Sequence, residues 1–141
     1  EYLRGVLPRG HYSRIESPET APGFPDVFYT VQGATGSLEL KFSKHPTSLR
    51  PFKHDGLREK TQIPWIEAEV AAEGCVWIVG EVGNRVFWVY GSHARKFNDY
   101  TLKQLTKAAS VIVPRSGLKP KHLEWTNLCL KGYIFTHDNC K

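Results

Sequence analysis

Two carboxylates and an amine stand in segments that otherwise have the composition of β-strands. Asp26 begins one apolar run, and Glu39 and Lys41 lie inside the next. Residues two apart in a strand project from the same face, so Glu39 and Lys41 would be neighbours. An acid beside an amine can hold a cation and a phosphate together, which predicts chemistry on a polyanion. The residues expected on the opposite, buried face are Leu38, Leu40 and Phe42.

The dipeptide Gln32-Gly33 lies between the two runs and predicts a two-residue hairpin turn. That turn would place Asp26 directly opposite Glu39, with their Cβ atoms about 5 Å apart. Two carboxylates this close destabilise a sheet unless a cation or a proton lies between them. Oxygen ligands of this kind suit Mg²⁺ or Mn²⁺, and Lys41 could then orient water and offset charge on a phosphate.

The same residues also have a structural interpretation. Glu39 and Lys41 could form a solvent-facing ion pair on an edge strand, and Asp26 could be a turn residue. Exposed pairs of this kind contribute only about 0–1 kcal/mol to stability. Residue types alone leave both interpretations open.

The rest of the chain predicts the elements that would position these residues. Strands are expected at 11–17, 26–31, 34–42, 75–79, 86–90 and 110–113, and helices at 62–73 and from Asn98 or Asp99 to 109, with a helical turn in 1–7. Thr61 would cap the first long helix and Gly74 would end it, while Gly83-Asn84 would turn the second hairpin. This order predicts an α/β or α+β fold with a mixed sheet.

Length and composition indicate one domain over residues 1–141, with a core at about 11–113 and an unassigned tail at 114–141. No apolar run is long enough to span a membrane, and no signal-peptide pattern is present, so a soluble intracellular protein is expected. Three cysteines, an odd number, favour free thiols in a reducing compartment.

The net charge of +5 is unevenly distributed. Residues 41–60 contain six Lys or Arg against two Asp or Glu, directly after Glu39. Cations beside a carboxylate site would hold the phosphates of a polyanion. The alternative is a solvated loop that happens to be rich in lysine.

Taken in order, these residues resemble the signature of the PD-(D/E)xK nucleases. Pro25-Asp26 is followed thirteen positions later by Glu39-Leu40-Lys41. Over roughly residues 11–90 the chain is similar to the virus-type replication-repair nuclease (VRR-NUC) group. The positions that carry this resemblance are Gly23, Pro25, Asp26, Glu39, Lys41, Gln62, Trp65 and Gly74.

The resemblance implies a restriction-endonuclease-like core, a mixed central β-sheet flanked by helices, that cleaves DNA by metal-dependent phosphodiester hydrolysis. It implies that Asp26, Glu39 and the backbone carbonyl of Leu40 bind Mg²⁺ or Mn²⁺, and that Lys41 supports catalysis. Gln62 would position Lys41 or a phosphate, or would be a solvated residue of the first helical turn.

The group usually has a further acidic residue on a helix upstream, and here the chain departs from it. Glu16 is the favoured candidate, with Glu1 and Glu19 as alternatives, and each could be a surface carboxylate. The resemblance also implies branched DNA intermediates as substrates and a homodimer. The residues expected to contact the DNA backbone are Lys44, Arg50, Lys53, Arg58 and Lys60.

Two other interpretations remain. One is a noncatalytic nucleic-acid-binding or assembly module on a decayed nuclease scaffold, although Asp26, Glu39 and Lys41 are all present. The other is a zinc site in the tail, formed by His122, Cys129, His137 and Cys140, whose spacing does not match known finger types.

Of the four tryptophans, Trp65, Trp77 and Trp88 are expected in the core, and Trp125 is unassigned.

Overall fold

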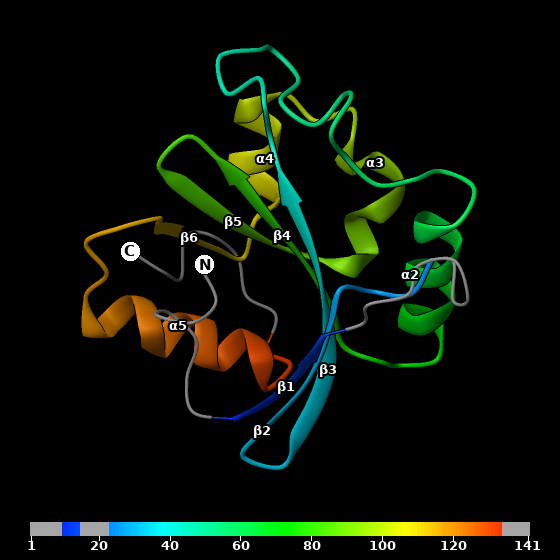
Figure 1. Cartoon of the computed structure of the whole chain (residues 1–141), viewed down its shortest axis with the longest axis vertical. Coiled ribbons are helices and arrows are strands. Elements are labelled where there is room, and N and C mark those ends of the chain that lie inside the picture. The colour runs from blue at the N-terminus through cyan, green and yellow to red at the C-terminus, as the bar shows by residue number, and fades with distance from the viewer. Residues whose placement is uncertain (1–9, 15–22, 134–141) are drawn as a thin grey trace.

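A six-stranded mixed sheet runs through the computed structural model and is flanked by four helices in the part of the chain that the structure describes, residues 10–14 and 23–133 (Figure 1). The expected α/β fold with a mixed sheet is therefore confirmed. The strands are β1 (His11–Arg14), β2 (Val27–Val31), β3 (Ala34–Phe42), β4 (Val76–Val82), β5 (Arg85–Tyr90) and β6 (Val111–Pro114). The helices are α2 (Gln62–Ala71), α3 (Ala94–Phe97), α4 (Leu102–Ala108) and α5 (Pro120–Leu130), with a 3₁₀ turn at Gly91–His93 before α3.

The strands follow chain order across the sheet, and only β3 and β4 run parallel. A parallel pair needs a crossover connection, which α2 and the long loop before it provide. Both predicted hairpin turns are present. Gln32 and Gly33 have φ of 50° and 84°, as a type I′ turn requires, and the predicted register holds down to the pair Val27–Leu38. The second hairpin turns at Gly83-Asn84.

The two faces of the sheet carry separate apolar clusters. Leu38 and the partly buried Leu40 belong to the cluster beneath α5, whereas α2, α3 and α4 cover the other face. Glu39 and Lys41 alternate with these residues and therefore project toward α2. The prediction that Phe42 is buried is wrong, because this last residue of β3 is 54% exposed.

Helix α5, in the described part of the tail, contributes to the core. Cys129 and Leu130, near the end of α5, are fully buried against the sheet. The hydroxyl of Tyr29 donates to the carbonyl of Leu130 at 2.7 Å, and the indole of Trp77 donates to the carbonyl of Cys129 at 2.7 Å. These bonds satisfy carbonyls at the end of the helix, which would otherwise lack partners. The expected core of 11–113 therefore has to be extended to include α5.

The end of α2 differs from the prediction. The helix ends at Ala71, and Thr61 precedes it without a side-chain capping bond. Glu73, rather than Gly74, takes the left-handed conformation, with a φ of 65°. The amide of Gly74 then donates to the carbonyl of Glu69 at 2.8 Å, the bond that closes a Schellman motif.

The helix expected from Asn98 or Asp99 to 109 begins later than predicted, as α4, and a separate short helix, α3, precedes the expected range. α3 ends at Phe97, and α4 begins after Thr101, whose hydroxyl accepts from the amide of Gln104. The Gln104 side chain accepts from the amide of Thr101 in return, which completes a capping box. A Thr-x-x-Gln pattern is a local start signal, so the sequence contained the correct boundary.

Several smaller expectations have a clear outcome. Trp77 and Trp88 are fully buried, whereas Trp65 is only half-buried. β1 confirms a strand in the first part of 11–17, while the rest of that range and the turn expected in 1–7 lie outside the described residues. None of the helices described is long and apolar enough to cross a membrane.

Candidate active site

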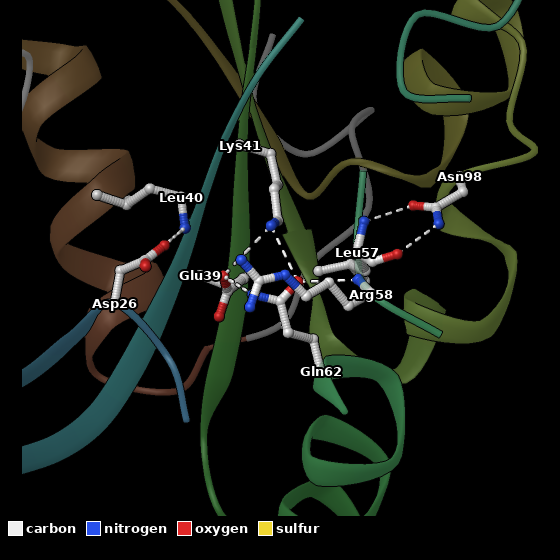
Figure 2. A network of polar contacts seen from close by, with 8 residues as sticks. All are labelled: Asp26, Glu39, Leu40, Lys41, Leu57, Arg58, Gln62 and Asn98. Carbon is white, nitrogen blue, oxygen red and sulfur yellow. Dashed lines mark hydrogen bonds and ion pairs between the residues drawn. The ribbon is translucent and has the colours of Figure 1, made fainter. Parts of the chain in front are cut away.

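Three polar side chains meet where the middle of β3 faces the beginning of α2 (Figure 2). The amide of Gln62 donates to Oε1 of Glu39 at 2.8 Å, and Nζ of Lys41 donates to Oε1 of Gln62 at 2.9 Å. Nζ of Lys41 also lies 3.5 Å from Oε1 of Glu39. Gln62 is only 7% exposed, so it is not the solvated residue of the alternative interpretation. From the beginning of α2, Gln62 bridges the carboxyl of Glu39 and the ammonium group of Lys41 on β3.

Asp26 reaches this group in a different way from the one predicted. The β2–β3 ladder ends at Val27–Leu38, so Asp26 lies in a bend just outside it instead of pairing with Glu39. Its Oδ2 accepts a hydrogen bond from the backbone amide of Leu40 at 2.8 Å. The Asp26 side chain thus accepts the hydrogen bond that a backbone carbonyl would accept if β2 continued further. Figure 2 shows Leu40 and Lys41 pointing to opposite sides of β3.

The carboxyl group of Glu39 is in an unusual electrostatic environment. Burial and, to a lesser degree, the neighbouring Asp26 raise its pKa, and Lys41 lowers it; the net result is a rise from 4.5 to about 8. The charge of Asp26 is among these causes, so the two carboxyl groups are close together. Within the part of the chain that the structure describes, Oε2 of Glu39 is buried and has no hydrogen-bond partner. Because the pKa stays raised despite Lys41, a proton or a second cation would stabilise Glu39 here.

The pair Asp26 and Glu39 fits a divalent cation that takes further ligands from its substrate. No group of three or more His, Cys, Asp or Glu suited to a metal ion occurs among the described residues. Mg²⁺ is commonly held by one or two carboxylates and by substrate phosphates, so the pair is sufficient. The unpartnered Oε2 of Glu39 gives such an ion a ligand. The expected role of the Leu40 carbonyl stays a prediction, and Glu16, Glu1 and Glu19 lie outside the described residues.

The basic loop is anchored to the core. Phe52 and Leu57 are buried, and the ring of Phe52 packs against that of Phe97 at 4.7 Å. All five residues expected to contact DNA are exposed, namely Lys44, Arg50, Lys53, Arg58 and Lys60. A fixed loop holds these charges in a defined arrangement beside the site.

The structure separates the five basic residues into different roles. Arg50 donates to the carbonyl of Asp99 at 3.2 Å, and Lys53 forms an ion pair with its carboxylate at 3.4 Å. Only Arg58 is joined to the site, because its backbone amide donates to Oε1 of Gln62 at 2.9 Å. The single acceptor on Gln62 therefore holds both Lys41 and the end of the loop.

Sequence analysis gave Asn98 only as one of two possible starts of a helix and missed its connection to the site. Its side chain accepts from the amide of Leu57 at 2.7 Å and donates to the carbonyl of the same residue at 2.8 Å (Figure 2). Gly56 makes this possible, since a Cβ there would lie 1.9 Å from Oδ1 of Asn98. Because the contact joins residues 41 positions apart, no local sequence pattern predicts it. It places Leu57 immediately before the Arg58 amide that binds Gln62.

Replacing Asn98 by alanine is expected to lower the free energy of unfolding by about 1–3 kcal/mol, because both polar backbone groups of the buried Leu57 lose their partner. Urea denaturation measures this change. The neighbouring Asp99→Ala provides the control, since it removes only an exposed ion pair worth about 0–1 kcal/mol. Equal effects of the two substitutions would show that the side chain of Asn98 does not hold the loop.

Two of the four residues of the alternative zinc site lie among the described residues. Cys129 is on the buried face of α5, and the ring of His122 packs against Trp125 at a centroid distance of 5.3 Å. His137 and Cys140 lie outside the described residues. Trp125 is half-buried against the sheet, and Nζ of Lys121 lies 5.6 Å from its ring. Trp125 thus has a packing role.

No protein family model matches the chain, and searches among curated proteins and among solved structures give no match to it. The function therefore has to be inferred from the geometry of Asp26, Glu39, Lys41 and Gln62.

Proposed function

We propose that the protein is a metal-dependent deoxyribonuclease that hydrolyses phosphodiester bonds on a restriction-endonuclease-like core. The observation that carries this proposal is the buried carboxyl of Glu39, which lies beside Asp26 on one side and is bridged by Gln62 to Lys41 on the other. The order of the elements also supports it. The hairpin β2–β3, the crossover through α2 and the parallel β4 put these residues on neighbouring elements, as the resemblance to VRR-NUC nucleases implies.

Asp26 and Glu39 would hold Mg²⁺ or Mn²⁺, with the carbonyl of Leu40 as a further ligand. When bound, such an ion would supply Lewis acidity for activating water and neutralising phosphate charge. The environment of Glu39 suits metal binding. A bound cation stabilises a buried carboxylate most when one of its oxygens has no other partner, as Oε2 of Glu39 does among the described residues.

Lys41 would contact the phosphate that is cleaved. Its ammonium group has three donors, of which Gln62 accepts one, and the side chain is 14% exposed. The remaining donors can therefore reach a phosphate oxygen or the attacking water. Gln62 keeps the ammonium group in place before substrate binds, so little reorganisation is needed in the transition state.

We infer DNA as the substrate from the resemblance and from the exposed basic side chains of the loop. Lys44, Arg58 and Lys60 would contact phosphates without reading bases. A preference for branched replication or recombination intermediates, and action as a homodimer, are part of the same proposal and follow from the resemblance alone.

The test is cleavage of linear, flapped and four-way DNA in Mg²⁺, in Mn²⁺ and in EDTA. Cleavage that needs the metal and that is lost in Lys41→Ala, purified in parallel, is expected. The parallel preparation also excludes a contaminating nuclease. DNA binding without any metal-dependent cleavage would refute the nuclease and favour the noncatalytic binding module.

A further inference from the structure

Three aromatic rings gather beside the carboxylate pair. The ring of Phe24 lies 5.7 Å from that of Trp65 and 6.4 Å from that of Phe28, and Phe28 lies 6.5 Å from Trp65. All three contacts are edge-on. Phe24 is 44% exposed, and the other two rings are half-buried. The cluster is therefore open to solvent mainly through Phe24.

The cluster is built from the elements that build the site. Phe24 and Phe28 are each two residues from Asp26, and Trp65 follows Gln62 by about one helical turn. The ring of Phe28 contacts Trp65 of α2, so it projects from β2 toward α2. Glu39 also faces α2, where it bonds to Gln62, so the aromatic cluster and this carboxyl lie on the same side of the sheet.

Gly23 fixes the position of Phe24. Its φ is 87°, and a Cβ at this position would lie 2.4 Å from the carbonyl oxygen of Thr61. Only glycine allows this conformation together with so close an approach. The chain just before Asp26 therefore packs directly against the beginning of α2, which brings Phe24 onto Trp65.

The exposed ring of Phe24 is close enough to Asp26 in the chain for one substrate to contact both residues. Two residues of backbone span at most about 7 Å, so a base on Phe24 would belong to the nucleotide whose phosphate lies at Asp26, or to the next one. Aromatic side chains bind bases by stacking irrespective of sequence, but the base has to leave its own stack first. A ring beside a phosphate-cleaving site selects for unpaired nucleotides.

We propose that Phe24, supported by Phe28 and Trp65, stacks an unpaired nucleobase next to the phosphate that is cleaved. The substrate is then DNA with an unpaired nucleotide at the cleavage position, such as a flap or a single-stranded branch. The inference rests on the proposed nuclease function and names its substrate class.

The test measures binding separately from cleavage. The Lys41→Ala protein in Mg²⁺ is titrated with flapped DNA that carries the fluorescent base 2-aminopurine at the branch nucleotide, and with a fully paired duplex of the same sequence. We expect 2-aminopurine fluorescence to fall on binding. Adding Phe24→Ala is expected to weaken binding of the flapped DNA by about 5- to 100-fold, with little effect on the duplex.

Phe42→Ala is the matched control, because Phe42 is another exposed phenylalanine and is the last residue of β3. Phe24→Leu keeps an apolar side chain at the cluster but removes the aromatic face, so it should behave like Phe24→Ala even if alanine disturbs folding. Equal losses on flapped and paired DNA, or unchanged fluorescence, would overturn the inference. Cleavage by the unaltered protein is scored independently, so base stacking without cleavage would refute the nuclease and retain the base site.

Discussion

Lys41→Ala is expected to lower the rate of metal-dependent cleavage by about 100- to 1,000-fold, the usual loss when a positioned charge is removed from a reacting phosphate. The structure gives a reason to expect the upper part of this range. Nζ of Lys41 is held 2.9 Å from Gln62 and 3.5 Å from Glu39, so the donor is fixed before substrate arrives. Its loss also removes the cation that lowers the pKa of Glu39, which makes that carboxyl a weaker metal ligand.

Lys44→Ala provides the matched control for this experiment. Lys44 follows three residues later and is exposed, and only its backbone amide is bonded, to Asp55 at 2.9 Å. Its removal should affect the Michaelis constant and the salt dependence of cleavage, and should change kcat by less than about threefold. Single-turnover rates at saturating DNA separate the two effects. Comparable losses of kcat in both variants would indicate that Lys41 acts only as a general cation.

The features that the sequence predicts well are those encoded within a few residues. Glycine at position 33 and the alternation along 34–42 are local properties, and together they are sufficient for the register of β2–β3 and for the shared face of Glu39 and Lys41. The Thr101–Gln104 capping box is local too, although a neighbouring Asn and Asp obscured it.

The features that the sequence does not predict depend on distant parts of the chain. Where β2 stops decides whether Asp26 pairs with Glu39 or bonds to Leu40, and no property of the hairpin itself determines that end. The depth of burial of Glu39 depends on how α2 packs over β3. Asn98 meets Leu57 only because α3 lies against the loop.

Helix α5 was left unassigned, although its sequence contains signals of a helix. Pro120 at the first turn is a helix-start signal, and the buried residues Thr126, Cys129 and Leu130 have helical spacing. What could not be inferred is the surface that α5 covers. Its last carbonyls bond to Tyr29 and Trp77, which are far away in the chain.

Glu39→Gln is expected to stabilise the protein at pH 8 in the absence of metal, while abolishing metal-dependent cleavage. The pKa of Glu39 is raised from 4.5 to about 8, so the folded protein binds this proton more tightly than the unfolded chain does. The stability associated with the protonated group is fully present below about pH 4.5 and is lost as the pH rises through about 8. Glutamine keeps the shape of the protonated acid and does not titrate.

The difference in the free energy of unfolding between Glu39→Gln and the unaltered protein should therefore grow from near zero at pH 4.5 to several kcal/mol at pH 8. A tenfold change in proton affinity is worth about 1.4 kcal/mol, which sets this order of magnitude. Urea denaturation in EDTA across this pH range measures it. Glu67→Gln is the control, because Glu67 is exposed and paired with Arg95, and its effect should stay below about 1 kcal/mol with no growth over the same range.

Adding Mg²⁺ tests whether the carboxyl of Glu39 binds a metal ion. A cation that binds only the folded protein stabilises it by about 2.7 kcal/mol at a hundred times its dissociation constant. Because the ion replaces the proton on Glu39, this gain should appear in the unaltered protein and in Glu67→Gln at pH 8, shrink toward pH 5, and be absent from Glu39→Gln. Equal stabilisation of all three proteins by Mg²⁺ would place the ion elsewhere. If Glu39→Gln were no more stable than the unaltered protein at pH 8 in EDTA, Glu39 would already be paired as a carboxylate, and its burial would need no metal.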